Sequence, residues 1–67
     1  MTVPRSQIEN FKGCNVRIEY HVEGKVHMTR RGIIKRIGLA NIHIEQESGR
    51  HYRIPVHSVS AIKELVA

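Results

Sequence analysis

This 67-residue sequence contains no aspartate and no tryptophan, and it has only one cysteine, Cys14. A single cysteine cannot form an internal disulfide, and no CxxC or Cys/His spacing surrounds it, so a disulfide framework is excluded and a conventional structural zinc site is not expected. We predict that Cys14 is a small buried hydrophobic side chain in a reducing compartment.

The sequence also lacks a long apolar run. No segment approaches the roughly 18 apolar residues that a membrane span requires. The N-terminal stretch MTVPRSQIEN lacks the charged-then-apolar layout of a signal peptide. We therefore expect a cytoplasmic protein with no membrane partner.

The chain is short. It forms one domain at most, over residues 1–67, and a domain of this size hides only about 60% of the surface that its unfolded chain exposes. We expect the isolated chain to be marginally stable, and assembly with other copies would add to that stability.

Motifs for catalysis are missing. The sequence has no GxSxG, no P-loop, no GxGxxG and no acidic pair with general acid and base spacing. A catalytic pocket is also hard to form in so small a core. Histidines stand at positions 21, 27, 43, 51 and 57 without any i,i+4 pair, although neighbouring strands could still bring them together. We expect no enzyme, no cofactor and no bound metal.

Positive charge is in excess. Lys and Arg total 11 against 6 Glu, which gives a formal net charge of +5. Such a chain carries a positive potential that favours polyanions, nucleic acid above all, although the charge says nothing about the fold. The densest cationic cluster is expected to contact phosphates, with a solvated surface as the alternative; its members are Arg30, Arg31, Lys35 and Arg36. Arg50 and Arg53 are weaker candidates of the same kind.

Residue types that favour strands dominate. There are 9 Ile and 7 Val but only 2 Leu, and β-branched side chains pack well on a pleated surface. The N-terminal segment PRSQIENFKG differs, and we predict a short helix over about residues 5–12. Ser6 and Glu9 have the spacing of a capping box, Ile8 and Phe11 share one helical face, and Gly13 can adopt the left-handed conformation that ends a helix.

Five short strands are predicted between about residues 15 and 65. In the first strand, alternation places Val16, Ile18, Tyr20 and Val22 on one face. A turn at Glu23–Gly24 leads into the second strand, where Gly32 indicates a bulge or a sharp bend. The segments NIHIEQE, HYRIPV and VSAIKEL supply the other three strands. The expected fold class is mainly β, with the strands curled into a small barrel after the N-terminal helix.

Several segments resemble the Sm-like superfamily, which comprises the Sm, Lsm and Hfq proteins. NVRIEY is similar to the first strand of that family, GIIKRI to its Gly-x-Ile/Leu bend, and NIHIE to its third strand. VHSVSAI resembles the Lys-His-Ala-Ile-Ser-Thr-Val signature of Hfq. This resemblance covers about residues 6–62 and implies a short 3₁₀ corner at Pro55–Ser58, between a fourth strand that ends with Tyr52–Ile54 and a fifth strand over Val59–Ile62.

The same resemblance implies assembly and a ligand. In this family the edge of the fourth strand pairs with the edge of the fifth strand of the next subunit, which closes a homo-oligomeric ring. It also implies that Asn41 and His57 contact RNA. The alternatives are a turn residue with an Asx hydrogen bond for Asn41 and a corner histidine that satisfies backbone groups for His57.

The chain departs from the family at identifiable positions. Val56 replaces the lysine that precedes the histidine in Hfq, and Leu39 replaces an aromatic residue that usually stacks on a base. The first hairpin, over residues 21–31, is longer than usual. We expect Phe11 and Tyr20 in the core, which leaves Tyr52 as the one aromatic available for stacking on a base.

A second resemblance points to a different role. GIIKRI, IHIE and RIPVHSVSAI are also similar to YolD-like small barrels, and both resemblances imply an SH3-like barrel. The first hypothesis is an oligomeric ring that binds single-stranded RNA, or DNA, without catalysis. The second is an SH3-like barrel that binds a protein by strand addition or peptide docking and has no nucleic-acid ligand.

Overall fold

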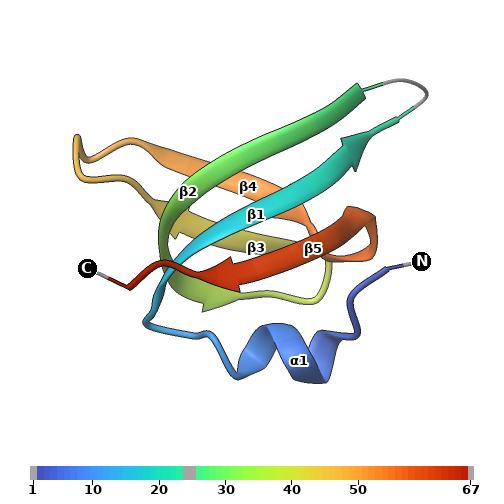
Figure 1. Cartoon of the computed structure of the whole chain (residues 1–67), viewed down its shortest axis with the longest axis horizontal. Helices are drawn as coiled ribbons and strands as arrows, with labels where there is room; N and C mark the ends of the chain where they lie inside the picture. Colours follow the sequence, from blue (N-terminus) through green and yellow to red (C-terminus); the bar gives the residue numbers. More distant parts are fainter. Residues whose placement is uncertain (1, 24–25, 67) are drawn as a thin grey trace.

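The computed structural model describes residues 2–23 and 26–66 and shows one short helix and one β-sheet (Figure 1). The elements follow the predicted order and are α1 (Arg5–Glu9), β1 (Asn15–Val22), β2 (Val26–Ile37), β3 (Asn41–Glu45), β4 (His51–Pro55), the 3₁₀ turn η1 (Val56–Ser58) and β5 (Val59–Glu64). All strand pairs are antiparallel, in the order β4-β3-β2-β1-β5. The predicted mainly β class is confirmed. The sheet is open, with β4 and β5 as its two edges.

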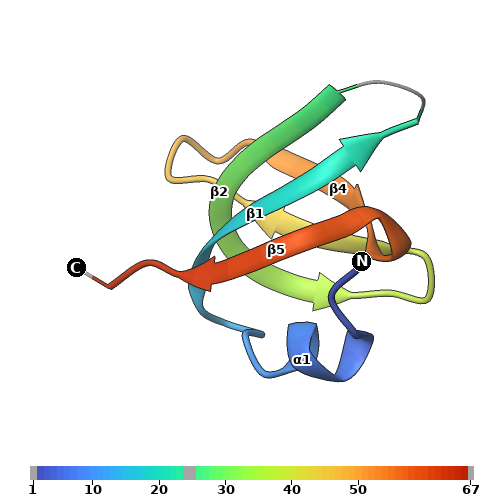
Figure 2. The same cartoon turned by 45° about the vertical axis from the view of Figure 1, so that its right-hand side comes forward.

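The long strand β2 connects the two halves of the sheet, and it curves strongly (Figure 2). Residues 26–33 of β2 pair with β1, and residues 33–37 pair with β3. A Cβ atom on Gly32 would lie 2.9 Å from the carbonyl oxygen of Glu45, so only glycine allows the β3 backbone to approach this closely. Gly32 is therefore a point of close approach. The register shift lies between Ile34 and Arg36, so the bulge is at Lys35 and not at the glycine.

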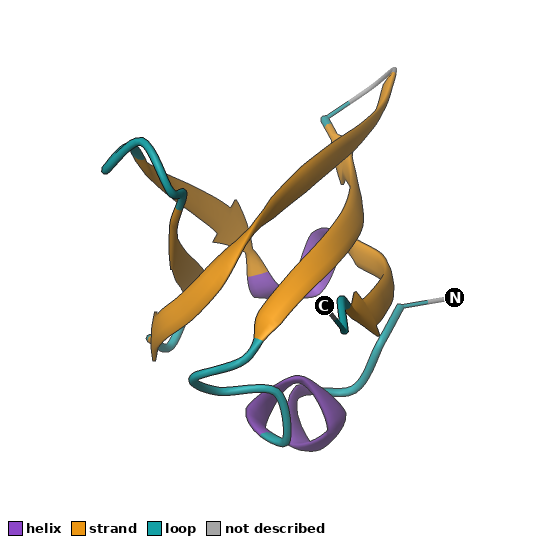
Figure 3. Ribbon diagram, turned by 60° about the vertical axis from the view of Figure 1, so that its left-hand side comes forward, coloured by secondary structure: helices purple, strands orange, loops and turns teal. Residues whose placement is uncertain are grey.

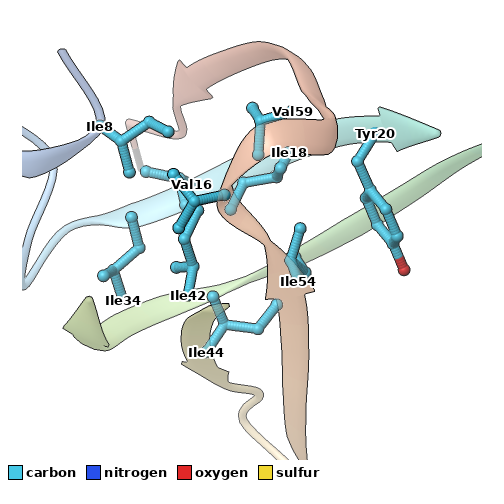
Figure 4. Packing of buried hydrophobic residues seen from close by; sticks show 10 residues of the cluster. Ile8, Val16, Ile18, Tyr20, Ile34, Ile42, Ile44, Ile54 and Val59 are labelled. Atoms are coloured by element: carbon cyan, nitrogen blue, oxygen red, sulfur yellow. The ribbon is translucent and has the colours of Figure 1, made fainter. Parts of the chain in front are cut away.

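Ten buried hydrophobic side chains form one core between the inner face of the curved sheet and α1 (Figure 4). They are Ile8, Val16, Ile18, Tyr20, Ile34, Ile42, Ile44, Ile54, Val56 and Val59. Phe11, Cys14 and Tyr52 are partly buried against this cluster. The predicted alternation of the first strand holds as far as Tyr20, but Val22 is 47% exposed because it lies beyond the core, near the end of the hairpin.

The helix α1 lies across one end of the curved sheet (Figure 3). Its Ile8 side chain is fully buried in the core (Figure 4). Its predicted capping box is wrong. The N-cap is Pro4, no side chain caps the helix, and Ser6 lies inside the first turn. Glu9 instead accepts a hydrogen bond from Arg5 Nε at 3.1 Å. The helix ends at Glu9, before the predicted residue 12, and the following turn closes at Gly13 with a φ of 85°, which confirms the left-handed conformation.

The connections agree with the predicted boundaries to within a few residues. Val22 pairs with Val26 across the first hairpin, while Gly24 of the predicted Glu23–Gly24 turn lies outside the described residues. The predicted 3₁₀ corner is present, but it begins at Val56 because Pro55 still belongs to β4. Within the described part of the chain, no helix is long and apolar enough to cross a membrane.

Candidate nucleic-acid interface

The turn η1 joins the two edge strands of the sheet and holds His57 on the surface. Val56 is 3% exposed and anchors the turn in the core, and its backbone N–H donates to the carbonyl oxygen of Ala40 at 2.9 Å. His57 is exposed, and its imidazole makes no hydrogen bond with any residue that the structure describes. The interpretation of His57 as a corner residue that satisfies backbone groups is therefore not supported by a contact.

Asn41 lies at the same end of the sheet. It is the first residue of β3 and pairs with Pro55, the last residue of β4, which places it beside the start of η1. Its backbone oxygen accepts a hydrogen bond from Gly38 N at 2.8 Å. Its half-buried side chain makes no hydrogen bond within the described ranges, so the alternative of an Asx turn is also without a contact.

A surface hollow of about 440 Å³ lies beside His57. Its walls come from the N-terminal segment, from the loop before β3 and from η1, and they consist of Thr2, Val3, Pro4, Arg5, Leu39, Val56 and His57. Leu39 is 92% exposed and adds apolar surface to the hollow. This hollow combines an apolar surface with an imidazole that has both nitrogens available.

Arg5 shapes this hollow, and the sequence analysis did not identify it. Its Nη1 donates to the carbonyl oxygen of Gly38 at 2.7 Å, and its Nη2 donates to that of Ile37 at 3.5 Å. These bonds tie the helix to the loop that carries Leu39. No local pattern in the sequence pairs Arg5 with residues so far along the chain, so only the fold reveals this role.

The predicted cationic cluster of β2 is divided by the structure. Arg30 pairs with Ile18 on the inner side, and its guanidinium carbon lies 4.3 Å from the centre of the Tyr52 ring. Interaction with the Tyr20 hydroxyl raises the pKa of Arg30 above its ordinary value, against the opposing effect of burial. Arg30 Nε is buried without a hydrogen-bond partner among the described residues. Arg30 therefore lies on the inner face of the sheet, packed against Tyr52, and not beside the other cations of the predicted cluster.

Lys35 is also partly neutralised, because its Nζ lies 3.6 Å from Oε1 of Glu45. Lys35 is exposed and Glu45 is partly exposed, so solvent screens this ion pair and it contributes little to stability. Of the four predicted residues, Arg31 and Arg36 are the ones that are exposed and without an ion pair in the described structure.

The strand register places these two arginines in separate rows. Arg31 lies opposite Arg17 on β1, and Arg17 lies opposite Lys63 on β5. Arg36 lies opposite His43 on β3, and His43 lies opposite Arg53 on β4. Residues directly opposite each other in a sheet point to the same face. Because the flanking residues on each strand include buried core residues, both rows face outward.

Tyr52 is less available for stacking on a base than the sequence suggested. It is half-buried, it packs against the core, and the guanidinium of Arg30 covers one face of its ring. A base cannot stack on that face while Arg30 occupies it. Tyr52 is therefore better described as a support for Arg30 than as an open stacking platform.

The histidines do not assemble into a cluster with other ligands. His21 and His27 face each other across the first hairpin, with ring centroids 4.1 Å apart in an edge-to-face arrangement. No group of three or more His, Cys, Asp or Glu side chains in the described ranges is placed to hold a metal ion. A larger hollow, of about 800 Å³, lies near the end of β1 and is lined in part by Tyr20, Arg53 and Ser58.

Comparisons with protein-family models, with curated proteins and with solved structures found no match for this chain. The functional interpretation therefore depends on the corner at η1, on the hollow beside it and on the cations of the outer face.

Proposed function

We propose that this protein is a non-catalytic, Sm-like small barrel that assembles into a homo-oligomeric ring and binds single-stranded RNA. The observation that carries the proposal is the position of the two edge strands. β4 and β5 are the two edge strands of the open sheet, and the 3₁₀ turn that holds His57 joins them. At the start of β5, the carbonyl oxygen of Val59 already accepts a hydrogen bond from Val3 N at 2.9 Å. The element order, with a short helix, five strands and a 3₁₀ turn between β4 and β5, supports the proposal.

Edge strands favour assembly for a physical reason. An exposed edge presents a row of unpaired backbone N–H and C=O groups, and natural proteins cover such edges or pair them. In this chain the two edges lie on opposite sides of the sheet, so β4 of one copy can pair with β5 of the next. A head-to-tail contact of this kind closes into a ring when the rotation between copies allows it. A ring would also add buried surface to a small domain.

The ligand is inferred from charge and from unsatisfied polar groups. The net charge of +5 favours a polyanion. His57 and Asn41 present side-chain donors and acceptors at one end of the sheet, and Leu39 adds an apolar surface for a base. Single-stranded RNA offers unstacked bases and phosphates to such a surface. Single-stranded DNA is the closest alternative ligand, since this site has no contact assigned to the 2′-hydroxyl.

Assembly is tested first by native mass spectrometry of nuclease-treated protein at near-physiological salt. One closed species of about five to eight subunits is the expected result. A monomer or a dimer would exclude the ring. The free edges would then favour the second candidate function, an SH3-like barrel that binds a protein partner by strand addition, because those edges are also suited to that mode.

RNA binding is tested by titrating a fluorescent oligouridylate with the wild-type protein and with His57→Ala. We expect the variant to bind roughly five- to tenfold more weakly, as for the loss of one or two hydrogen bonds. The matched control is His51→Ala, which removes another exposed histidine from β4 at the opposite end of that strand. Equal affinities of both variants and the wild type would contradict a role for the corner in binding RNA.

A further inference from the structure

A row of three cations crosses the outer face of the sheet. Arg31 on β2, Arg17 on β1 and Lys63 on β5 lie directly opposite one another, as the strand register shows. All three residues are exposed. Val16 and Ile18, on either side of Arg17, are fully buried, so the Arg17 side chain points away from the core. We call these three residues the outer row.

Among residues 2–23 and 26–66, no side chain forms an ion pair with the outer row, and Glu19, which lies diagonally to Arg31 and Lys63 on the same face, is not within ion-pair distance. The ion pairs of the described structure are Arg5–Glu9 and Lys35–Glu45, and neither involves the outer row. Neighbouring strands lie about 4.8 Å apart, and like charges directly opposite each other destabilise a sheet. The fold therefore holds three positive charges side by side although their mutual repulsion opposes it. An anionic ligand that spans the row would remove this repulsion.

A linear polyanion fits this arrangement better than a small anion does. The three cations stand in a line across three strands instead of converging on one point. Phosphate groups of a nucleic-acid backbone are also arranged in a line, and arginine binds each of them through two parallel N–H donors. Contacts to the phosphate backbone do not depend on the base sequence, and they fix the position of the nucleic-acid strand on the protein.

We propose that the outer row, Arg31, Arg17 and Lys63, is a phosphate-contacting site for the backbone of single-stranded nucleic acid, separate from the corner at η1. Lys63 lies near the end of β5 that is remote from η1, so the two sites are distinct on each subunit. The site goes beyond the proposed function because all three residues belong to one protomer and require no ring. The row Arg36–His43–Arg53 has a histidine at its centre, so it carries a weaker permanent charge.

The test compares the double variant Arg17→Gln/Arg31→Gln with the control Lys12→Glu. Both variants lower the net charge by two at exposed positions, but Lys12 lies in the turn after α1, outside the row. The probe is a fluorescent oligouridylate, titrated with full-length protein at several salt concentrations. Each phosphate contact to a single strand contributes about 0.7 to the slope of log affinity against log salt, so the outer-row variant should reduce that slope by about 1.4.

The control variant should change the slope much less. Equal losses in the outer-row variant and in Lys12→Glu would overturn the proposal, because net charge alone would then account for the effect. Absence of oligouridylate binding by the wild type, or a row-dependent affinity for anionic lipid vesicles instead, would overturn it as well. Circular dichroism and thermal unfolding of each variant verify that the fold is retained.

The two proposals can fail separately in the same titration. Loss of binding in the outer-row variant with no effect of His57→Ala, and with a monomeric protein, would support the outer row and contradict the corner site. If His57→Ala weakens binding as expected and the outer-row variant leaves the salt slope unchanged, the corner site is supported and the outer row is contradicted.

Discussion

Arg17 and Arg31 lie directly opposite each other on β1 and β2, both are exposed, and neither forms an ion pair in the described part of the chain. Lys63 extends this arrangement on the other side of Arg17. Two like charges in directly opposed positions lower the stability of a sheet. The position of Arg17 between two other cations makes it the residue whose removal relieves most repulsion.

Neutralising Arg17 should therefore stabilise the folded protein. We expect Arg17→Gln to raise the free energy of unfolding by about 0.5 kcal/mol at low ionic strength, since cross-strand charge pairs contribute roughly 0.2–1 kcal/mol. Urea unfolding at a fixed protomer concentration measures this change. Because salt screens exposed charges, the difference should shrink at high ionic strength. A loss of stability at low salt would show that repulsion within the row is not significant.

A side chain at Gly32 should force β2 and β3 apart. The added Cβ in Gly32→Ala would lie 2.9 Å from the carbonyl oxygen of Glu45, which is a backbone atom that cannot move alone. We expect a loss of about 1–3 kcal/mol, as for other overpacked sites. The comparison is Gly38→Ala, where the added Cβ would lie 3.3 Å from the carbonyl oxygen of Asn41, so a smaller loss is expected. Thermal unfolding of both variants decides whether close approach is the reason for glycine at position 32.

The anchor of the 3₁₀ corner can be tested by truncation. Val56 is 3% exposed, and its N–H bonds to Ala40, so Val56→Ala leaves a cavity under the turn that carries His57. We expect a loss of about 1–3 kcal/mol. Val66→Ala is the matched control, since Val66 is 85% exposed and its truncation should change stability by less than about 0.5 kcal/mol. Equal effects of the two truncations in urea unfolding would contradict the packing described for η1.

The contact between Arg30 and Tyr52 predicts which part of the tyrosine side chain stabilises the fold. The guanidinium carbon lies 4.3 Å from the ring centre, so the ring and not the hydroxyl supports Arg30. Tyr52→Phe should leave the free energy of unfolding nearly unchanged, whereas Tyr52→Leu should lower it by about 1 kcal/mol through loss of the cation–π contact. If the two variants unfold at the same denaturant concentration, the aromatic ring contributes nothing beyond its bulk.

Much of the fold follows from local sequence patterns. The two-residue alternation of Val16, Ile18 and Tyr20 identified β1, whereas the corner between β4 and β5 was implied by the resemblance of VHSVSAI to the Sm-like family. Gly13 adopts the predicted left-handed conformation, but the helix ends earlier, at Glu9. The capping box failed because Pro4 occupies the N-cap, so Ser6 is the second helical residue and does not make the bond of a cap.

The candidate site could be predicted only in part. Asn41 and His57 were identified from a short resemblance, and the structure brings them to one end of the sheet. Arg5 was missed because it acts through backbone oxygens of the loop before β3, which is remote in the sequence. Arg17 and Lys63 were missed because neither belongs to a dense run of charge.

The sequence alone determined the order of the helix and strands, the inward face of β1 as far as Tyr20 and the positive net charge, because these depend on residue type and spacing within one segment. Only the tertiary structure decided which cations lie directly opposite one another on neighbouring strands. The bulge at Lys35 shifts the register of β2, so Arg36 points outward where an unbroken strand would turn it toward the core. Pairing of β1 with β2 and β5 then aligns Arg17 with its neighbours, and register between distant segments is set by the packing of the whole sheet.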